Sequence, residues 1–535
     1  MSAFSLIFNS AGGPITGAQL QVATRGFQDH PAPPVLVQPH PNLAVFLYAD
    51  PAFELPVPVE MKGPSGGAFL VPSGPGAQPD LQPDHPELSP TSAHLLSESP
   101  RLLDRLRFPF LGIGWTEHSV RLLTDPLGFR AAFYSRQGDL LFAASEPSLL
   151  LVHPEVPNSP NMGILAERLS FRLNTPHQSI YDALRLVPTG SYLDMSVGGS
   201  LRIAPWYQWD TTVNHDRSLG EWQELIRETF LDIMRTELET RDPSTIMLSL
   251  SGGLDSSIIA GVIAHLGYDD QVQIIGRRYP GLPCDESAYQ DAVTAGTRFA
   301  TKYVNHRPLD PVKDVVEPIL AAQVPYRMFE PEGDDLVRWA VANGQHVLMD
   351  GIGGDECFAR AGGLLADALM DHRWGDVIGA VRGRSLRQLA GEHLAMTPHW
   401  WRVRRREHRP PSLVSQELSK KAGLAHRFEF ARRGAGADFL ARDRLHDNTS
   451  TGWQTLASES VHSRLRRWRI ENSTPFYHPT MFGLMLTVPD HLRARSDDSR
   501  FLQRSTFARF LPPAIRERRN KVHFDYRHGT DLLHP

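Results

Sequence analysis

A stretch rich in glycine and serine, SLSGGLDSS (residues 249–257), combines residue types that could hold phosphate. It follows the apolar run TIMLSL (245–250), typical of a buried strand, and precedes residues 256–266, whose pattern predicts a helix. Gly252 and Gly253 let the backbone turn tightly and come close to an anion. The helix that follows presents free N–H groups and the positive end of its dipole to that anion. This setting predicts a phosphate-binding loop.

The other side chains of this loop extend the prediction to a metal ion. The hydroxyls of Ser251, Ser256 and Ser257 add hydrogen-bond donors. The carboxylate of Asp255 would repel phosphate unless a cation lies between them, and Mg²⁺ binds one or two carboxylates together with phosphate oxygens. The GxxxxGK[ST] pattern of a Walker-type loop is absent. A plain Gly-Gly turn with a serine helix cap is the alternative.

A second glycine-rich stretch, DGIGGDECF (350–358), follows another apolar run, HVLMDG (346–351). Its glycines again permit a close backbone approach to a ligand, and Asp355 supplies a second carboxylate. If both loops lie at the ends of neighbouring strands, Asp255 and Asp355 could share one Mg²⁺ on the pyrophosphate portion of ATP. Alone, such a loop is often only a turn, so the prediction depends on the pair.

The elements around these loops alternate between strand and helix. Alternation of this kind predicts a parallel sheet covered on both faces, with ligands at the carboxyl ends of its strands. We expect strands at 245–250, 271–276, 301–306 and 346–351, and helices at 256–266 and 286–299. An amphipathic helix precedes them, with apolar residues at three- and four-residue spacing from Leu219 to Ile233.

The first 210 residues lack this alternation of strands and helices. Short apolar runs there are separated by Gly and Pro turns, which predicts a β-rich domain. The stretch 71–90 is rich in Pro, Gly and Asp and predicts a long surface loop. We place the domain boundary in DTTVNHDRS (210–218), giving domains 1–212 and 213–535, which agrees with a length of 535 residues. Residues 365–535 are expected to be mostly helical.

Composition narrows the class of protein. Hydrophobic residues make up 41% and charged residues 21%, as in ordinary globular proteins, and the net charge of −5 does not favour a nucleic-acid partner. The two cysteines rule out a disulfide framework and favour a cytoplasmic location. The first basic residue is Arg25, so no secretory signal is expected, and no apolar run approaches the roughly 18 residues of a membrane span.

SGGLDSS, followed about a hundred residues later by GxGGDE, resembles the synthetase domain of the asparagine synthetase superfamily. Further similarity lies in DPLGFRAAFYSRQGDLLFAASEPSLLL (125–151), LRLVPTGSYLDM (184–195), WYQWD (206–210), IENSTPFYHP (470–479) and LPPAIRERRNKVHF (511–524). The resemblance implies an α/β protein: a glutaminase-like α+β domain of the Ntn-hydrolase class, then a parallel-sheet ATP pyrophosphatase domain with a helical C-terminal part.

The same resemblance implies an AMP-forming carbon–nitrogen ligase that uses ATP and Mg²⁺. Asp255 and Asp355 would bind the metal and take part in catalysis, and Lys521 would lie near the α-phosphate, where its charge stabilises developing negative charge. The pyrophosphate would be held by Ser251, Gly252, Gly253, Ser256 and Ser257, and the adenine and ribose by Leu250, Ile275 and Gly351, largely through backbone. Asp285 and Glu286 resemble a family Asp-Glu pair, and an acidic first helix turn explains them equally well.

Three departures from the family pattern refine this expectation. Glutamine-dependent members carry a catalytic Cys where this chain has Ser2, so the N-terminal domain is expected not to release ammonia. Asparagine synthetases carry Glu, and β-lactam-forming synthetases Tyr, where this chain has Ile352, which can neither bind an ammonium group nor relay a proton. His478 replaces an Asp.

With these three departures, the chain resembles the lasso peptide cyclases. Those enzymes close a macrolactam between a core peptide's N-terminal amine and an Asp or Glu side chain. The resemblance implies a precursor peptide substrate, a leader-binding protein and a leader peptidase as partners. Another small-molecule amide synthetase, including a β-lactam-forming one, and a catalytically silent scaffold remain alternatives. The basic clusters at 402–409 and 464–469 are expected to be solvated faces or contacts with an acidic partner, rather than a nucleic-acid site.

Overall fold

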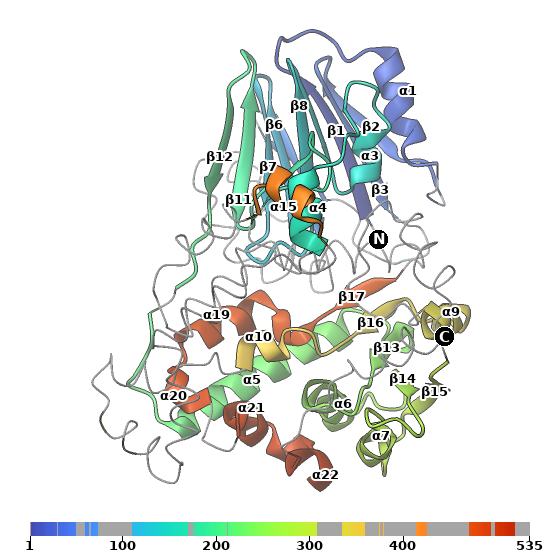
Figure 1. The fold of residues 1–535 in the computed structure, drawn as a ribbon, viewed down its shortest axis with the longest axis vertical. Coiled ribbons are helices and arrows are strands. Elements are labelled where there is room, and N and C mark those ends of the chain that lie inside the picture. The colour runs from blue at the N-terminus through green and yellow to red at the C-terminus, as the bar shows by residue number, and fades with distance from the viewer. Residues whose placement is uncertain are drawn as a thin grey trace.

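The computed structural model shows a β-rich N-terminal domain and a C-terminal domain built on a parallel sheet (Figure 1). The structure describes residues 2–28, 30, 32–49, 59–63, 66–72, 110–169, 175, 177–210, 212–307, 334–358, 374, 378, 414–424, 470–493 and 498–518. Most of the expected surface loop at 71–90, most of the stretch 365–469 and both basic clusters lie outside these ranges, as does Lys521. Residues 71 and 72 are described, and they belong to a strand rather than a loop.

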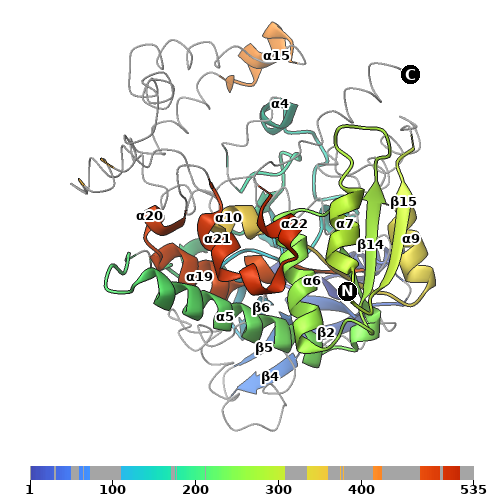
Figure 2. The same ribbon diagram turned by 90° about the horizontal axis from the view of Figure 1, so that it is seen from below.

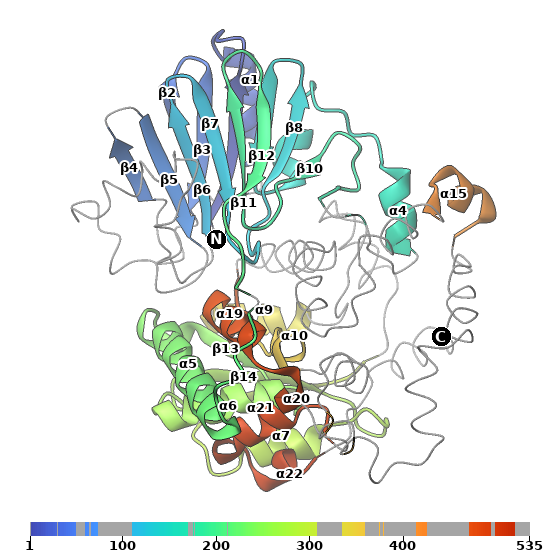
Figure 3. The same ribbon diagram turned by 90° about the vertical axis from the view of Figure 1, so that its left-hand side faces the viewer.

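Two six-stranded antiparallel sheets form the N-terminal domain (Figure 3). The first has the order β10-β8-β9-β1-β3-β2, with strands Arg185–Leu186, Phe133–Gln137, Leu140–Ala144, Ser2–Asn9, Leu43–Ala49 and Val35–His40. The second has the order β12-β11-β7-β6-β5-β4, with strands Leu201–Pro205, Ser191–Ser196, Ser119–Thr124, Phe110–Thr116, Gly66–Pro72 and Val59–Gly63. Four helices accompany the domain's described part: α1 Gly17–Arg25, α3 Pro147–Leu151 and α4 Met162–Leu169, with α15 Gln416–Lys421 packed on α4.

Strand β1 shows how alternation builds the two hydrophobic layers of this domain. Phe4, Leu6 and Phe8 are buried between the two sheets, in a cluster that includes residues of β6, β7 and β11. Ala3 and Ile7 are buried on the other face, in a cluster that includes residues of α1 and α3. Two stacked antiparallel sheets with helices on an outer face are the arrangement expected for a glutaminase-like α+β domain.

The C-terminal domain contains a five-stranded sheet of order β15-β14-β13-β16-β17, and all four neighbouring pairs are parallel. The strands are Ala300–Asn305, Gln273–Arg278, Ile246–Ser249, Val347–Met349 and Glu471–Ser473. The four predicted strands are therefore confirmed, together with the expected fold class. The fifth, β17, was not predicted, because a strand of three residues is too short to show a periodic pattern.

Helices cover both faces of this sheet (Figure 2). On one face, α5 Leu219–Glu239 and α6 Leu254–Leu266 pack against Ile246 and Leu248, while on the other α9 Asp334–Ala342 packs against Met247. The described helices also include α7 Ser287–Thr294, α10 Gly354–Phe358, α19 Pro479–Thr487, α20 Asp490–Arg493, α21 Phe501–Thr506 and α22 Pro513–Arg516, with 3₁₀ turns η2 Pro243–Thr245, η5 Pro475–Tyr477 and η6 Ala508–Phe510.

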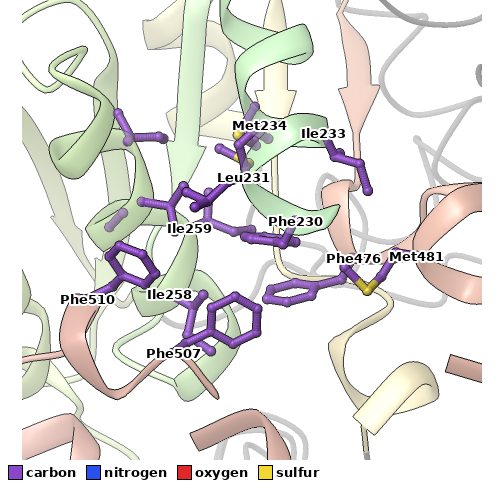
Figure 4. Close-up of a cluster of buried hydrophobic side chains, with 14 of the residues drawn as sticks. Phe230, Leu231, Ile233, Met234, Ile258, Ile259, Phe476, Met481, Phe507 and Phe510 are labelled. Atoms are coloured by element: carbon purple, nitrogen blue, oxygen red, sulfur yellow. The ribbon is translucent and has the colours of Figure 1, made fainter. Parts of the chain in front are cut away.

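Helix α5 begins with a capping box, in which Ser218 and Glu221 satisfy each other's backbone N–H groups. Its Phe230 ring stacks on Phe476 with centroids 4.4 Å apart and meets Phe507 edge-on at 5.2 Å (Figure 4). These contacts join α5 to segments more than 200 residues later in the chain, so the last described helices are part of the domain core.

The helix predicted over 286–299 ends at Thr294, because Gly296 takes a left-handed φ of 75° and the chain turns there to enter β15. The last N-terminal strand, β12, ends at Pro205 and α5 begins at Leu219, on either side of the predicted domain boundary. The boundary itself stays a prediction.

Candidate active site

The first glycine loop joins the end of β13 to the start of α6. Gly252 has a left-handed φ of 84°, and a Cβ at this position would lie 3.0 Å from Tyr289 Cβ, so the turn requires glycine. The Ser251 hydroxyl accepts the Gly253 N–H at 3.1 Å and lies 3.2 Å from the Ser256 hydroxyl. These two hydroxyls therefore meet at the N-terminus of α6, as a phosphate-binding loop requires.

Ser257 is arranged differently from the other two serines. Its side chain is fully buried, and its hydroxyl donates to the Gly253 carbonyl at 2.6 Å. This bond holds the first turn of α6 to the loop. Its predicted direct contact with pyrophosphate stays a prediction.

The second glycine loop lies directly against the first. A Cβ on Gly351 would be 2.7 Å from Asp255 Cβ, and a Cβ on Gly354 would be 2.0 Å from Asp255 Oδ1. No real side chain tolerates such distances, so these glycines are required for the two loops to approach each other. Gly353, with a φ of 94°, makes a similar approach to Tyr477, whose backbone nitrogen would be 2.5 Å from an added Cβ.

Asp255 and Asp355 converge on the guanidinium group of Arg500. Arg500 contacts Asp255 through two nitrogen–oxygen pairs at 2.9 and 3.2 Å and forms an ion pair with Asp355. Burial alone would lower the pKa of Arg500, but the two carboxylates outweigh burial and raise it. Gln503 donates to Asp255 Oδ1 at 2.7 Å, so two side chains from the α21 region hold this carboxylate.

Glu356 lies beside the two aspartates and supports the second loop. It accepts the Gly353 N–H at 3.0 Å. Burial, followed by the neighbouring charges of Asp355 and Asp255, raises the pKa of Glu356 above its ordinary value, against the opposing effect of its backbone hydrogen bonds. Ile352, in the same loop, is 45% exposed, which makes it an apolar side chain presented at the edge of a polar site.

A second arginine, Arg518, braces the first loop from the other side. It donates to the Gly252 carbonyl at 3.2 Å, forms an ion pair with Glu286, and lies 4.0 Å above the centre of the Tyr289 ring. Asp285 has a different role: it accepts the Ser287 N–H and hydroxyl and the Tyr279 N–H, so it ties the chain after β14 to the start of α7. Of the two acidic residues predicted here, only Glu286 contacts the loop through Arg518.

Other sequence-predicted residues lie around this centre. The Leu250 N–H bonds to the Ile275 carbonyl at 2.9 Å, and both side chains are buried in the core, so only backbone is left there for a nucleotide. His478 caps α19 by accepting the Thr480 N–H at 3.2 Å. Ser2 begins β1 opposite Ala49.

Magnesium is implied by the family resemblance, and the residues at this site fit such an ion. Within the described ranges, no group of three His, Cys, Asp or Glu side chains is placed to hold a metal ion. Two carboxylates are nevertheless enough for Mg²⁺ when phosphate oxygens supply further ligands. Asp255 and Asp355 already converge on one cationic group, that of Arg500. The negative charge of these two carboxylates would therefore favour a bound cation between them.

Sequence reasoning missed Arg500, Gln503, Arg518 and Glu356. Arg518 lies in the basic run 516–519, which gave no reason to prefer one arginine over another. Nothing in the spacing connects position 500 with positions 255 and 355. Only the packing of α21 against the two loops brings Arg500 to them.

Paired glycine loops at the carboxyl ends of adjacent parallel strands, each with an aspartate, define a nucleotide-phosphate type of site. The asparagine synthase family model matches residues 225–534, more than half of the chain. The protein therefore belongs to the asparagine synthase family.

Two curated relatives share part of the chain. Asparagine synthetase [glutamine-hydrolyzing] 3 of Bacillus subtilis is 28% identical over 166 residues, which are 30% of this chain and 26% of that protein. The amidase chry2 of Gibberella zeae is 25% identical over 301 residues, 51% of this chain and 43% of that protein. The chain thus matches less than half the length of either relative.

Solved structures give weaker likenesses. The B. subtilis glutamine phosphoribosylpyrophosphate amidotransferase, in complex with ADP and GMP, is 10% identical, with a TM-score of 0.26 over 65% of this chain and 81% of that one. An allosteric regulatory enzyme of purine biosynthesis is 12% identical, with a TM-score of 0.24 over 70% and 78%. TM-scores this low support no conclusion.

None of the described helices combines the length and apolar character that crossing a membrane requires.

Proposed function

We propose that this protein is an ATP-dependent ligase that activates a carboxylate and joins it to an amine. The observation that carries the proposal is the convergence of Asp255 and Asp355, from loops after adjacent parallel strands, beside the N-terminus of α6. A carboxylate oxygen attacks the α-phosphate of ATP and pyrophosphate leaves. The amine then attacks the acyl carbon, AMP leaves, and the amine loses one proton.

The described residues divide this task. The loop glycines and the hydroxyls of Ser251 and Ser256 would bind phosphate oxygens, and the guanidinium of Arg500 would balance charge on the pyrophosphate leaving group. Bound Mg²⁺, held by Asp255 and Asp355, would neutralise phosphate charge and orient the pyrophosphate. Arg518 and Glu286 keep the first loop in its turn. The predicted role of Lys521 at the α-phosphate belongs to the same proposal.

For the substrate, we favour a ribosomally made peptide that is closed into a lasso-type macrolactam. The exposed apolar side chain of Ile352 supports this, because it provides no base for activating a weak nucleophile. A peptide's α-amino group has an ordinary pKa of about 7.7–8, so a useful fraction is neutral near pH 7 and needs only correct positioning. A leader-binding protein and a leader peptidase would then be partners, in the cytoplasm.

A small-molecule amide ligase is the second candidate, because the matched relatives are an asparagine synthetase and a protein named an amidase. Product analysis separates the two. The protein is incubated with Mg²⁺ and ATP, and with either aspartate plus ammonia or peptides that carry an N-terminal Gly and an internal Asp or Glu. AMP formed only with peptide, with the peptide mass falling by one water, supports the macrolactam. AMP formed with the amino acid supports the small-molecule reaction.

The metal assignment has its own test. Asp255→Asn and Asp355→Asn each keep the side-chain shape but remove a charge, so each should lower AMP formation by at least about 100-fold. Thermal unfolding checks that both variants fold. Wild-type turnover in either one would refute the assignment, and no AMP from the wild type with any substrate, even with candidate partners added, would favour a silent scaffold.

A further inference from the structure

Two side chains of the segment 125–130, which follows β7 in the N-terminal domain, pack into the core of the C-terminal domain. Leu127 is fully buried in a hydrophobic cluster whose other buried members all come from residues 222–515. Phe129 packs against the same cluster. The segment therefore belongs to one domain by sequence and to the other by packing.

Phe129 connects this segment to the second glycine loop. Its ring meets the ring of Tyr477 edge-on, with centroids 5.7 Å apart. The backbone of Tyr477 is pressed against Gly353 so closely that an added Cβ would lie 2.5 Å from the Tyr477 nitrogen. Gly353 is two residues from Asp355, so a shift of Tyr477 must move the loop that carries the aspartate.

Arg130 makes a second connection to the same region. It is half-buried and interacts electrostatically with Glu471 in β17. Strand β17 pairs with β16, and β16 leads directly into the second glycine loop. One short segment of the N-terminal domain thus packs on η5 through Phe129 and interacts electrostatically with β17, and both of these elements lie beside this loop.

We propose that Phe129 is a positioning residue for the synthetase site: through Tyr477, the N-terminal domain holds the second glycine loop and Asp355 where Mg²⁺ and ATP are bound. This inference rests on the proposed ATP-dependent function and assigns the N-terminal domain a role that needs no glutaminase chemistry. Phe129 itself touches neither aspartate in the contacts described, so it acts only through packing.

Equilibrium binding of ATP to the full-length chain, with and without Mg²⁺, tests the proposal and requires no acyl substrate. Phe129→Ala should weaken Mg²⁺-dependent ATP binding about tenfold or more, because loss of the ring lets Tyr477 and the loop shift. Phe129→Leu, which keeps most of the volume, should lie between Phe129→Ala and the wild type. Tyr134→Ala is the matched control, because Tyr134 is a half-buried aromatic residue packed on the N-terminal core.

The control should lose thermal stability but keep wild-type affinity for Mg²⁺-ATP. Wild-type affinity in Phe129→Ala would overturn the proposal, as would an equal loss of affinity in Phe129→Ala and Tyr134→Ala. If Phe129→Ala does not fold, wild-type affinity in Phe129→Leu would overturn it instead. A wild type that binds Mg²⁺-ATP but forms no AMP with any substrate would refute the proposed function and leave this inference standing. A wild type that binds no ATP would overturn both.

Discussion

Asp255 and Asp355 are a hundred residues apart in the chain, yet both form ion pairs with one guanidinium group, that of Arg500. Two carboxylates brought this close repel each other, and the charge of Arg500 offsets that repulsion. The same pair of carboxylates could hold a divalent cation, which would in turn attract the negative charge of phosphate. At the residue scale, the site is therefore a set of opposite charges held in place before any ligand binds.

Substitution of Arg500 tests this arrangement. Arg500→Met leaves the two carboxylates without their cation and should reduce AMP formation by about 100-fold. Arg500→Lys keeps the positive charge but lacks the forked guanidinium that reaches both carboxylates. Its rate of AMP formation should therefore lie between those of Arg500→Met and the wild type. Steady-state AMP release measures the effect, with thermal unfolding as the check on folding. Full activity in Arg500→Met would show that the guanidinium is dispensable.

At the scale of elements, the glycines of the second loop set the distance between two turns. The carboxyl ends of β13 and β16 lie side by side, and the loops that follow can pack only if no Cβ intervenes. The sequence alone explains glycine at these positions by a close approach to ligand. The structure adds a second reason, which is contact with Asp255.

Gly354→Ala should separate the loops, because its Cβ would lie 2.0 Å from Asp255 Oδ1. We expect the free energy of unfolding to fall by about 1–3 kcal/mol and AMP formation to be largely lost. Gly220→Ala, in the first turn of α5 with nothing within 4 Å of the new Cβ, should keep full activity and gain about 0.4–1 kcal/mol. Urea unfolding measures the stability of both variants, and AMP assays measure their activity. A fully active Gly354→Ala would contradict the argument that this glycine is needed for the two loops to pack.

At the scale of the whole molecule, the two domains share a buried interface around residues 125–130. Asp125 is fully buried there, and burial raises its pKa to about 7 although backbone hydrogen bonds oppose the shift. Arg130 lies half-buried nearby, and this partial burial lowers its pKa to about 10, although the charges of Glu471 and Asp125 act to raise it. The interface thus contains a carboxyl group that is protonated below neutral pH.

This carboxyl makes stability depend on pH. The folded protein holds the Asp125 proton up to pH 7, whereas the unfolded chain releases it near its ordinary pKa of 3.8. The free energy of unfolding should therefore fall as pH rises from about 4 to about 7, by at most about 1.4 kcal/mol per pH unit. Asp125→Asn is neutral at every pH and should lack this slope. Urea unfolding of both proteins between pH 4.5 and 7.5 measures it, and parallel curves would exclude the assignment.

The local features of this protein could be predicted from its sequence. Apolar runs, turns and glycine–serine loops act over a few residues, so four strands, the helix after SGGLDSS and the two-domain fold class were all predictable. The residues that bind or brace the loops could not be predicted in the same way. Arg500 and Arg518 carry no local signal, and β17 is a strand only because β16 lies beside it.

The sequence by itself was enough to predict the class of site, because a phosphate loop needs only short-range backbone geometry and a helix N-terminus. The tertiary structure decided which charges meet there, since positions 255, 355 and 500 are brought together by long-range packing that spacing does not encode. It also decided that Leu127 and Phe129 of the N-terminal domain pack into the C-terminal core, because burial of Leu127 depends on a surface formed by segments far apart in the chain.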